Sequence, residues 1–524
     1  MSRDSSVIGA GLAPARAART ITPGERIHVV GIGGAGASGA ALLARGAGAL
    51  VDGCDVAGAS SYVPALLAQG IAVVEGHDPA HVTRVPPPDR LAVTKALTAI
   101  HPDHPELKAA RRLGIPVEPW QQVVADAAVD RDLIGVAGTH GKSTSAGWLV
   151  HVLVSAGEDP SAFVGALLPS SLTGGLPATA RLGAGRAFVV EADEYAGNFD
   201  PYHPAVAIVT GAEWDHPDVF PDRSAVIAAF ARWLEAAAAA RAAFGLAPPI
   251  LVANVTDAGC ELLVRRLADW PGTILATALL DGTEPPRPGV VRGIAEQYAT
   301  AGGRARALLG RVVAADPLGT TLELTGLDPI VGETVVRLAT AGRHNASNAL
   351  GVAGACLAIG LPPPAISDGL GTFTGVGRRL ERKGEAAGVV VYDDYGHHPT
   401  AIRETLRAVR QREPERRIWA VYEPLTFNRT AALLDDFAAA LGEADAVAIA
   451  DIWPGRDLDT SIASAAGLAA AVAEDRPDME VGAPGSVEAT AAWLAERVRP
   501  GDAVLVMGGG RSYRIGELLL ERLG

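Results

Sequence analysis

A glycine-rich turn, with an apolar run before it and a helical stretch after it, is the segment best suited to hold phosphate. It consists of Gly138, Thr139, His140, Gly141, Lys142, Ser143 and Thr144. Backbone N–H groups of such a turn face a bound phosphate, the lysine adds a positive charge, and the next hydroxyl can bind Mg²⁺. The usual phosphate-loop pattern has glycine where Val136 stands, so this turn is a shorter variant. It predicts a site for ATP and Mg²⁺.

Carboxylates follow two expected strands after this turn. The first strand, 187–190, leads into Glu191, Asp193 and Glu194. Because Mg²⁺ prefers oxygen ligands, Ser143 and Glu191 are candidate metal ligands. The next strand, 205–210, is followed by His216, a candidate ligand of a second metal. A solvated acidic turn and a structural histidine are the alternatives.

A second glycine turn follows a β-branched run at 27–30. Its candidate binding residues are Gly33, Gly34, Ala35, Gly36, Ser38 and, about twenty residues later, Asp55. Glycines let a backbone approach a pyrophosphate, and an acidic side chain can hold a ribose or sugar hydroxyl. NAD and a nucleotide diphosphate sugar fit this pattern equally well, and a plain strand–turn–helix is the third interpretation.

A third polar cluster, Asp-Asp-Tyr-Gly-His-His-Pro at 393–399, follows an expected strand at 389–392. So many polar side chains at one strand end are hard to explain by packing, and α/β sheets bind ligands at that edge. Arg378 and Arg379 precede the strand and either bind an anionic substrate or form a solvated linker.

The composition narrows the class of protein. The chain has 524 residues, and 45 Lys and Arg against 59 Asp and Glu give a formal charge of −14. An acidic chain is a poor general binder of nucleic acid or anionic membranes, so neither is expected as a partner. Three separated cysteines exclude a disulfide framework, and Cys54 is expected to be a small apolar filler. With no secretory signal in view, we expect a cytoplasmic protein with a flexible tail over residues 1–24.

Alternating strand and helix signals predict doubly wound α/β domains. We expect a flexible tail and three domains, at 1–24, 25–130, 131–374 and 375–524. Within the central domain, residues 304–338 alternate in β fashion and predict an antiparallel addition, and the Pro- and Gly-rich residues 282–292 predict a surface loop.

Taken in order along residues 25–520, these motifs resemble the Mur ligase family. The segments that carry the resemblance are 31–39, 138–143, 191–194, 213–218, 342–345 with Asn348, and 393–399. The run at 102–116 resembles the alanine-adding branch in particular. The resemblance implies a Rossmann-like UDP-sugar domain, a central P-loop-type ATPase domain and a Rossmann-like amino-acid domain, in a monomer or homodimer. Its implied substrates are UDP-N-acetylmuramate, ATP and L-alanine.

The resemblance also implies roles for single residues. The sugar's lactyl carboxylate would attack the γ-phosphate of ATP, and the amine of L-alanine would attack the resulting acyl phosphate. The nucleotide would contact the 138–144 turn together with His344, Asn345, Asn348, Arg379 and Asp394. The metals would be held by Ser143, Glu191 and His216. The catalytic set would be Lys142, Glu191, His216, Tyr395, His397 and Arg429.

The chain departs from the family pattern at three places. Gly211 stands where the family usually has Asn, Leu425 where it has His after Gln-Pro, and Arg511 where it has Asp. A divergent ligase that adds another amino acid or a recycled peptide, and a non-catalytic nucleotide-binding homologue, are therefore alternatives. An NAD-dependent oxidoreductase is a further one, but it leaves the Lys142 turn without a role.

Overall fold

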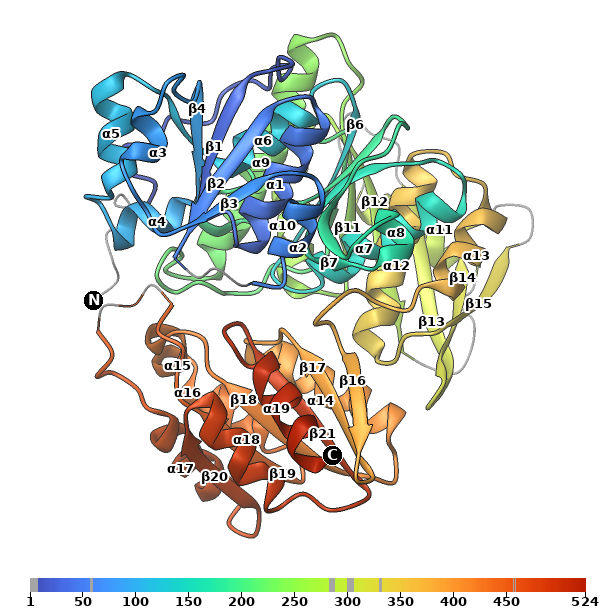
Figure 1. Ribbon diagram of the computed structural model, residues 1–524. Helices are drawn as coiled ribbons and strands as arrows, with labels where there is room; N and C mark the ends of the chain where they lie inside the picture. Colours follow the sequence, from blue (N-terminus) through green and yellow to red (C-terminus); the bar gives the residue numbers. More distant parts are fainter. Residues whose placement is uncertain are drawn as a thin grey trace.

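The computed structural model describes residues 8–56, 60–281, 288–298, 306–328, 332–455, 457 and 459–524. These residues form three α/β domains, each built on its own sheet (Figure 1). The expected fold class is confirmed. Within the described ranges, no helix has the length and apolar character needed to cross a membrane.

The N-terminal domain has a five-stranded parallel sheet in the order β3-β2-β1-β4-β5. Strand β1 is almost completely buried at the centre of the sheet, and the glycine turn after it leads into α1. The elements are β1 (Arg26–Val30), α1 (Ala35–Gly46), β2 (Leu50–Asp55), α2 (Val63–Ala68), β3 (Ala72–Glu75), α3 (Ala80–Thr83), β4 (Arg90–Val93), α4 (Lys95–Ile100), α5 (Pro105–Leu113), β5 (Val117–Pro119) and α6 (Trp120–Ala127).

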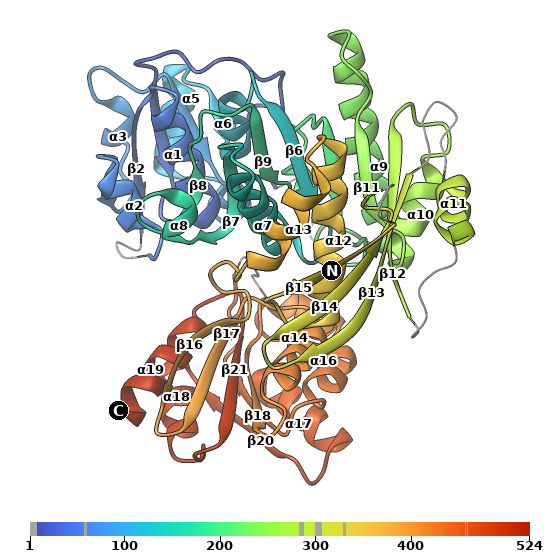
Figure 2. The same cartoon turned by 90° about the vertical axis from the view of Figure 1, so that its right-hand side faces the viewer.

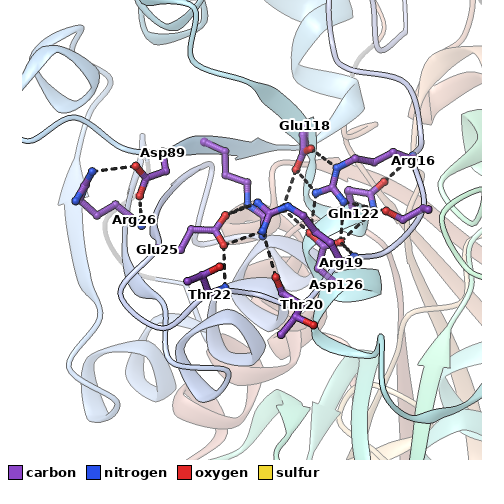
Figure 3. Close-up of polar contacts among 12 residues, drawn as sticks. Arg16, Arg19, Thr20, Thr22, Glu25, Arg26, Asp89, Glu118, Gln122 and Asp126 are labelled. Atoms are coloured by element: carbon purple, nitrogen blue, oxygen red, sulfur yellow. Dashed lines mark hydrogen bonds and ion pairs between the residues drawn. The ribbon is translucent and has the colours of Figure 1, made fainter.

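The segment 8–24, for which the sequence led us to expect a flexible tail, makes defined contacts with this domain (Figure 3). Arg16 donates to Glu118 and Asp126, both at 2.8 Å. Arg19 donates to Glu25 at 2.6 Å. These three carboxylates are buried around Arg90, and one cation does not balance three anions, so the arginines of the segment complete the cluster. Residues 1–7 lie outside the described residues.

The central domain has a ten-stranded sheet in the order β15-β14-β13-β12-β11-β10-β6-β9-β7-β8. Its first part comprises β6 (Asp132–Ala137), α7 (Lys142–Ser155), β7 (Ser161–Leu168), α8 (Ser170–Thr173), β8 (Ala178–Arg181), β9 (Ala187–Glu191), the 3₁₀ turn η2 (Tyr195–Gly197), β10 (Val206–Val209), α9 (Arg223–Ala243), β11 (Ile250–Asn254), α10 (Ala258–Arg266) and β12 (Thr273–Leu280). The apolar strands β6, β9 and β10 pair in parallel, so their carboxyl ends meet at one sheet edge.

The rest of the central domain comprises α11 (Pro288–Gln297), β13 (Arg306–Asp316), β14 (Gly319–Thr325), β15 (Glu333–Leu338), α12 (Arg343–Ala358) and α13 (Pro363–Thr372). The pairing of β13 with β14 and of β14 with β15 is antiparallel, which confirms the expected addition over the described residues. The surface loop expected at 282–292 is only partly tested, because residues 282–287 lie outside the described residues and α11 begins at Pro288.

The C-terminal domain has a six-stranded sheet in the order β16-β17-β21-β18-β19-β20. Its elements are β16 (Glu381–Ala386), β17 (Val389–Asp394), α14 (Pro399–Arg412), β18 (Arg417–Glu423), α15 (Phe427–Ala432), α16 (Leu434–Leu441), β19 (Ala446–Ala450), α17 (Ala465–Asp475), β20 (Glu480–Gly485), α18 (Val487–Ala495), β21 (Asp502–Gly508) and α19 (Tyr513–Leu523). Separate apolar cores cover the two faces of this sheet.

The C-terminal domain lies across the sheet edge where the phosphate-loop helix α7 begins. Figure 2 shows this domain below α7, with α14 beside the β13–β15 addition. The N-terminal and central domains share one apolar core, to which Leu43 and Phe163 belong. This arrangement brings residues from separate domains to a single cleft.

Candidate active site

A cavity of about 960 Å³ opens between the central and C-terminal domains. Seventeen of the expected site residues line it: Gly36, Thr139, His140, Gly141, Lys142, Ser143, Thr144, Glu191, His216, His344, Asn345, Asn348, Arg379, Asp394, Tyr395, His397 and Arg429. The expected residues outside this lining are Gly33, Gly34, Ala35, Ser38, Asp55 and Gly138. The structure therefore brings most of the expected nucleotide and catalytic residues together.

The turn between β6 and α7 has a backbone that glycine makes possible. Gly138 has φ +127° and Gly141 has φ +78°. A Cβ on Gly138 would lie 2.3 Å from the Thr210 hydroxyl, and one on Gly141 would lie 2.4 Å from Asn348 Oδ1. The turn is thus held close to its neighbours, and α7 presents its N-terminus to the cavity.

Lys142 lies beneath this turn among carboxylates. Its Nζ donates to Gly138 O at 2.7 Å and to Glu194 Oε2 at 3.0 Å, with Asp193 Oδ1 at 3.7 Å. Burial opposes its charge, but Glu194 and Asp193 outweigh burial and raise the pKa of Lys142. Burial raises the pKa of Glu194 to about 7 despite Lys142. Lys142 is therefore charged and close enough to the turn to be redirected to a bound phosphate.

Ser143 and Glu191 form an oxygen-rich contact at the start of α7. The Ser143 hydroxyl donates to Glu191 Oε1 at 3.0 Å and accepts from Arg379 Nη2 at 2.8 Å. Glu191 Oε2 accepts from Gly165 N at 2.6 Å, which orients the carboxylate. A hydroxyl and a carboxylate beside a phosphate turn are the donor set that Mg²⁺ prefers. Arg379 brings a cation of the C-terminal domain to the same point.

An ion pair between Arg429 and Asp215 joins the two domains beside His216. Arg429 Nε donates to Asp215 Oδ1 at 2.9 Å, and Nη2 lies 3.3 Å from His216 Nδ1. Both charged side chains are almost completely buried. His216 also lies in a cluster of possible ligand atoms with Asp193 and Glu194. His216 thus faces the carboxylates on one side and the arginine on the other.

Hydrogen bonds from backbone N–H groups hold the polar cluster at 393–399, at the end of β17. Asp394 accepts from Leu380 N at 2.8 Å and from Gly396 N at 2.7 Å, so its carboxylate closes the loop. The Arg379 guanidinium lies over the Tyr395 ring, 4.9 Å from its centroid. His397 Nδ1 lies 2.9 Å from Tyr395 O, and a carbonyl only accepts, so Nδ1 carries the proton. Burial and Arg429 lower the pKa of His397 well below its usual value, which keeps the ring neutral with Nε2 free to accept.

The residues expected around adenine begin α12. Asn345 Nδ2 donates to Ala341 O at 2.7 Å, and Asn348 Nδ2 donates to Asn345 Oδ1 at 3.3 Å. Burial lowers the pKa of His344, whose ring lies 3.8 Å from Glu404. These side chains line the cavity on the side of the Gly141 turn, where Asn348 approaches.

Comparison with known proteins gives the family. Residues 26–131 match the Mur ligase family, catalytic domain, and residues 378–510 match the Mur ligase, glutamate ligase domain. The UDP-N-acetylmuramate–L-alanine ligase of Frankia casuarinae is 34% identical over 520 residues, covering 95% of this chain and 98% of that protein. The chain belongs to the Mur ligase family. It is an ATP-dependent ligase of that family.

Further relatives agree with this assignment. The UDP-N-acetylmuramate–L-alanine ligase of Acidothermus cellulolyticus is 37% identical, covering 93% of this chain and 92% of that protein. The solved UDP-N-acetylmuramate–alanine ligase of Thermotoga maritima shares the fold, with a TM-score of 0.72, 21% identity, and coverage of 95% and 98%. The murein peptide ligase of Psychrobacter arcticus also shares it, with a TM-score of 0.68, 24% identity, and coverage of 96% and 99%. The resemblance seen in the sequence is confirmed, and the oxidoreductase interpretation falls away.

The first glycine turn of this Mur ligase lies beside the cavity, and Gly36 alone of its expected residues lines it. Asp55 Oδ2 accepts from Gly33 N at 2.9 Å, so this carboxylate braces the turn. Ser38 is buried and lies 3.2 Å from Thr179 Oγ1 of the central domain. Sugar contacts by these residues therefore stay a prediction.

The structure adds residues that the sequence-based site set left out. Glu213 Oε2 lies 3.2 Å from His140 Nε2 and accepts from the Thr400 hydroxyl at 2.8 Å. His398 stacks at an angle on His140, with ring centroids 4.7 Å apart. Glu213 follows β10 at the same sheet edge as Glu191. Its position just after an apolar strand is the sequence signal that could have added it to the expected site. Thr400 offered no such signal, because its partner comes from another domain.

Two of the departures from the family pattern have different surroundings. A Cβ on Gly211 would meet the Asp257 carboxyl at 3.7 Å, an ordinary contact, so glycine is not required there for steric reasons. Leu425 lines the cavity near Arg429 and contributes an apolar surface. Leu425 therefore bears directly on what this Mur ligase binds.

We expect Glu213→Gln to destabilise the protein in a pH-dependent way. Burial opposes ionisation, but the hydrogen bond and charge of His140 outweigh it and lower the pKa of Glu213 from 4.5 to about 2. A lowered pKa stabilises the folded state above 4.5, and that stabilisation is lost as pH falls towards 2. Urea unfolding should show a loss of roughly 2–3 kcal/mol at neutral pH and a smaller loss at about pH 3.5. An equal loss at both pH values would exclude this origin.

Proposed function

We propose that this chain joins L-alanine to the lactyl carboxylate of UDP-N-acetylmuramate, with ATP converted to ADP and phosphate, in peptidoglycan precursor synthesis. One observation carries the proposal. The Lys142 turn, the Ser143–Glu191 contact and Arg429 meet in one cavity although they come from two domains. The full-length relatives that are 34–37% identical act on these substrates by name, which favours the same pair here.

The first step places a carboxylate oxygen of the sugar against the γ-phosphorus of ATP. The new O–P bond forms as the bond to the β-phosphate oxygen breaks, which yields an acyl phosphate and ADP. Two anions must approach, so the step depends on positive charge around the γ-phosphate. Lys142 and Arg379 supply side-chain charge, and the N–H groups that begin α7 supply backbone dipoles.

Ser143 and Glu191 would hold Mg²⁺ beside the phosphates, and Asp193, Glu194 and His216 offer a second set of ligand atoms. When bound, Mg²⁺ neutralises phosphate charge and orients the oxygens. Neither set contains a cysteine, as expected for a cation that prefers oxygen. The ordered Glu191 carboxylate keeps one oxygen directed at Ser143 through its bond from Gly165 N.

The second step places the amine of L-alanine at the acyl carbon. The C–N bond forms, the C–O bond to phosphate breaks, and the proton of the amine passes to the departing phosphate or to solvent. The free Nε2 of neutral His397 can accept a hydrogen bond from the amine, and the buried Arg429 can hold the amino-acid carboxylate or the departing phosphate. Leu425 gives the apolar lining that suits a methyl side chain.

Phosphate release measured over a panel of substrates tests the proposal. We expect release from ATP only when UDP-N-acetylmuramate and a small L-amino acid are both present, with L-alanine best among the twenty. Assays lacking one substrate give the background. Turnover with a murein tripeptide but not with free L-alanine would identify a recycling ligase, and no turnover with any acceptor would identify a non-catalytic homologue. Either result would overturn the alanine assignment.

A further inference from the structure

A cluster of histidine, cysteine and glutamate side chains lies inside the N-terminal domain, among residues that do not line the cavity. The possible ligand atoms of His28, Cys54, His81 and Glu106 all lie within 4.8 Å of one another. They come from β1, β2, α3 and α5, four elements brought together on one face of the first sheet (Figure 1). The sequence favoured an apolar filler for Cys54, but the structure surrounds its sulfur with polar atoms.

Glu106 occupies the centre of the cluster. Its oxygens lie 3.2 Å from Cys54 Sγ, 3.2 Å from His28 Nε2 and 3.1 Å from His81 Nδ1. Cys54 Sγ lies 3.6 Å from His28 Nε2. Ligands at about 2.0–2.3 Å from a tetrahedral zinc are about 3.3–3.8 Å apart. These four distances lie within a few tenths of an ångström of that range, and all the possible ligand atoms lie within 4.8 Å of one another.

A second layer of hydrogen bonds orients His28 towards the centre of the cluster. His28 Nδ1 lies 2.7 Å from Asp52 Oδ1, and Arg84 pairs with the same carboxylate. Because the Asp52 carboxylate accepts, Nδ1 carries a proton, and Nε2, which faces Cys54 and Glu106, is the ring atom that would bind an ion. A carboxylate behind a histidine in this way is typical of zinc ligands.

Two partly exposed histidines connect the cluster to the surface of the domain. His77 and His81 are four residues apart, and their side chains are 16% and 18% exposed. His77 Nδ1 lies 3.2 Å from Cys54 Sγ. His104 packs edge-on against His77 with centroids 4.5 Å apart, is buried, and has no hydrogen-bond partner for either ring nitrogen within the described structure. Four histidine side chains therefore lie around the single thiol of Cys54 and the single carboxylate of Glu106.

We propose that His28, Cys54, His81 and Glu106 bind one zinc ion that holds the N-terminal domain together. A set with one thiolate and two imidazole nitrogens favours zinc over Mg²⁺ or Ca²⁺, which prefer oxygen ligands. Four protein ligands leave no open position, so the ion is structural. Binding replaces the thiol proton of Cys54 with the metal and releases that proton to solvent.

The ion would brace the first glycine turn. Cys54 O accepts from Gly31 N at 2.8 Å and from Ile32 N at 3.1 Å, and the next residue, Asp55, accepts from Gly33 N. A metal on Cys54 therefore fixes the end of β2, on which the turn rests. The zinc site stands apart from the proposed reaction, because the substrates do not need to reach it.

Cobalt spectroscopy of the full chain tests the proposal without an activity assay. The protein is stripped with a chelator and titrated with Co²⁺, whose bond to a thiolate gives a near-ultraviolet charge-transfer band. We expect about one equivalent to produce this band with intense tetrahedral visible bands, and one equivalent of Zn²⁺ to remove both. No cysteine is among the described residues that line the cavity, so metal bound there cannot produce the thiolate band.

Variants identify the residues that produce the charge-transfer band. Cys54→Ser should lose the charge-transfer band, and Cys260→Ser, which changes a buried free cysteine of the central domain, should keep it. If Cys54→Ser does not fold, His81→Gln, at a half-buried position, should weaken Co²⁺ binding at least tenfold with folding judged by circular dichroism. A wild-type protein without the band, a Cys54→Ser protein that keeps it, or unchanged binding by His81→Gln would overturn the proposal and leave Glu106 as a hydrogen-bonded carboxylate.

Discussion

Replacing Lys142 by alanine lowers the rate of substrate-dependent phosphate release by about a thousandfold or more. The reason is electrostatic, because Lys142 belongs to the phosphate turn itself and its Nζ lies 2.7 Å from Gly138 O. Its loss leaves the attack of one anion on another without that charge. Steady-state phosphate release at saturating UDP-N-acetylmuramate and L-alanine measures the effect, which should fall on kcat.

A control separates the loss of this charge from a general effect of removing a lysine. Lys108 is an exposed lysine that pairs with Asp103, outside the cavity, and Lys108→Ala should keep the wild-type rate. Lys142→Ala also leaves Glu194 buried without its cation, but the pKa of Glu194 is already raised to about 7 and its protonation relieves the site. We therefore expect a folded protein. A folded Lys142→Ala protein with wild-type kcat would contradict the mechanism.

Arg429→Ala should have the second-largest effect, because it removes a buried cation that joins two domains. Asp215, its partner at 2.7 Å, would be left buried without an arginine. Breaking such a pair typically costs about 3–5 kcal/mol. We expect a separate, earlier unfolding transition of the C-terminal domain in calorimetry, together with phosphate release lowered at least a hundredfold.

A matched variant distinguishes charge from geometry at this site. Arg429→Lys keeps the positive charge but loses the fork that contacts Asp215 and His216 together. It should recover most of the thermal stability and little of the rate. If Arg429→Ala unfolds as one transition at the wild-type temperature, the ion pair does not hold the domains together.

Local patterns predicted the parts of the fold that local sequence controls. The strands that end at Glu191 and Asp394 were visible as apolar runs followed by polar residues, and the Lys142 turn was visible through its glycines. The antiparallel residues 306–338 were visible as an alternation, over their described part. In each case the signal and the structure lie in the same short segment.

Contacts between distant segments were not predictable in the same way. Arg16 looked like part of a flexible tail because its partners, Glu118 and Asp126, lie more than a hundred residues away. Cys54 looked like an apolar filler because nothing near it in the sequence shows that His28 and Glu106 will surround it. Buried charges and thiols take their environment from tertiary packing, which periodicity does not encode.

Transfer of a heavy oxygen isotope from the sugar to phosphate tests the central claim most directly. UDP-N-acetylmuramate labelled in both oxygens of its lactyl carboxylate is converted with ATP and L-alanine, and the phosphate is analysed by mass spectrometry. If the carboxylate attacks the γ-phosphorus in this cavity, each phosphate released with product carries one labelled oxygen. Unlabelled phosphate formed together with the alanine adduct would contradict the account.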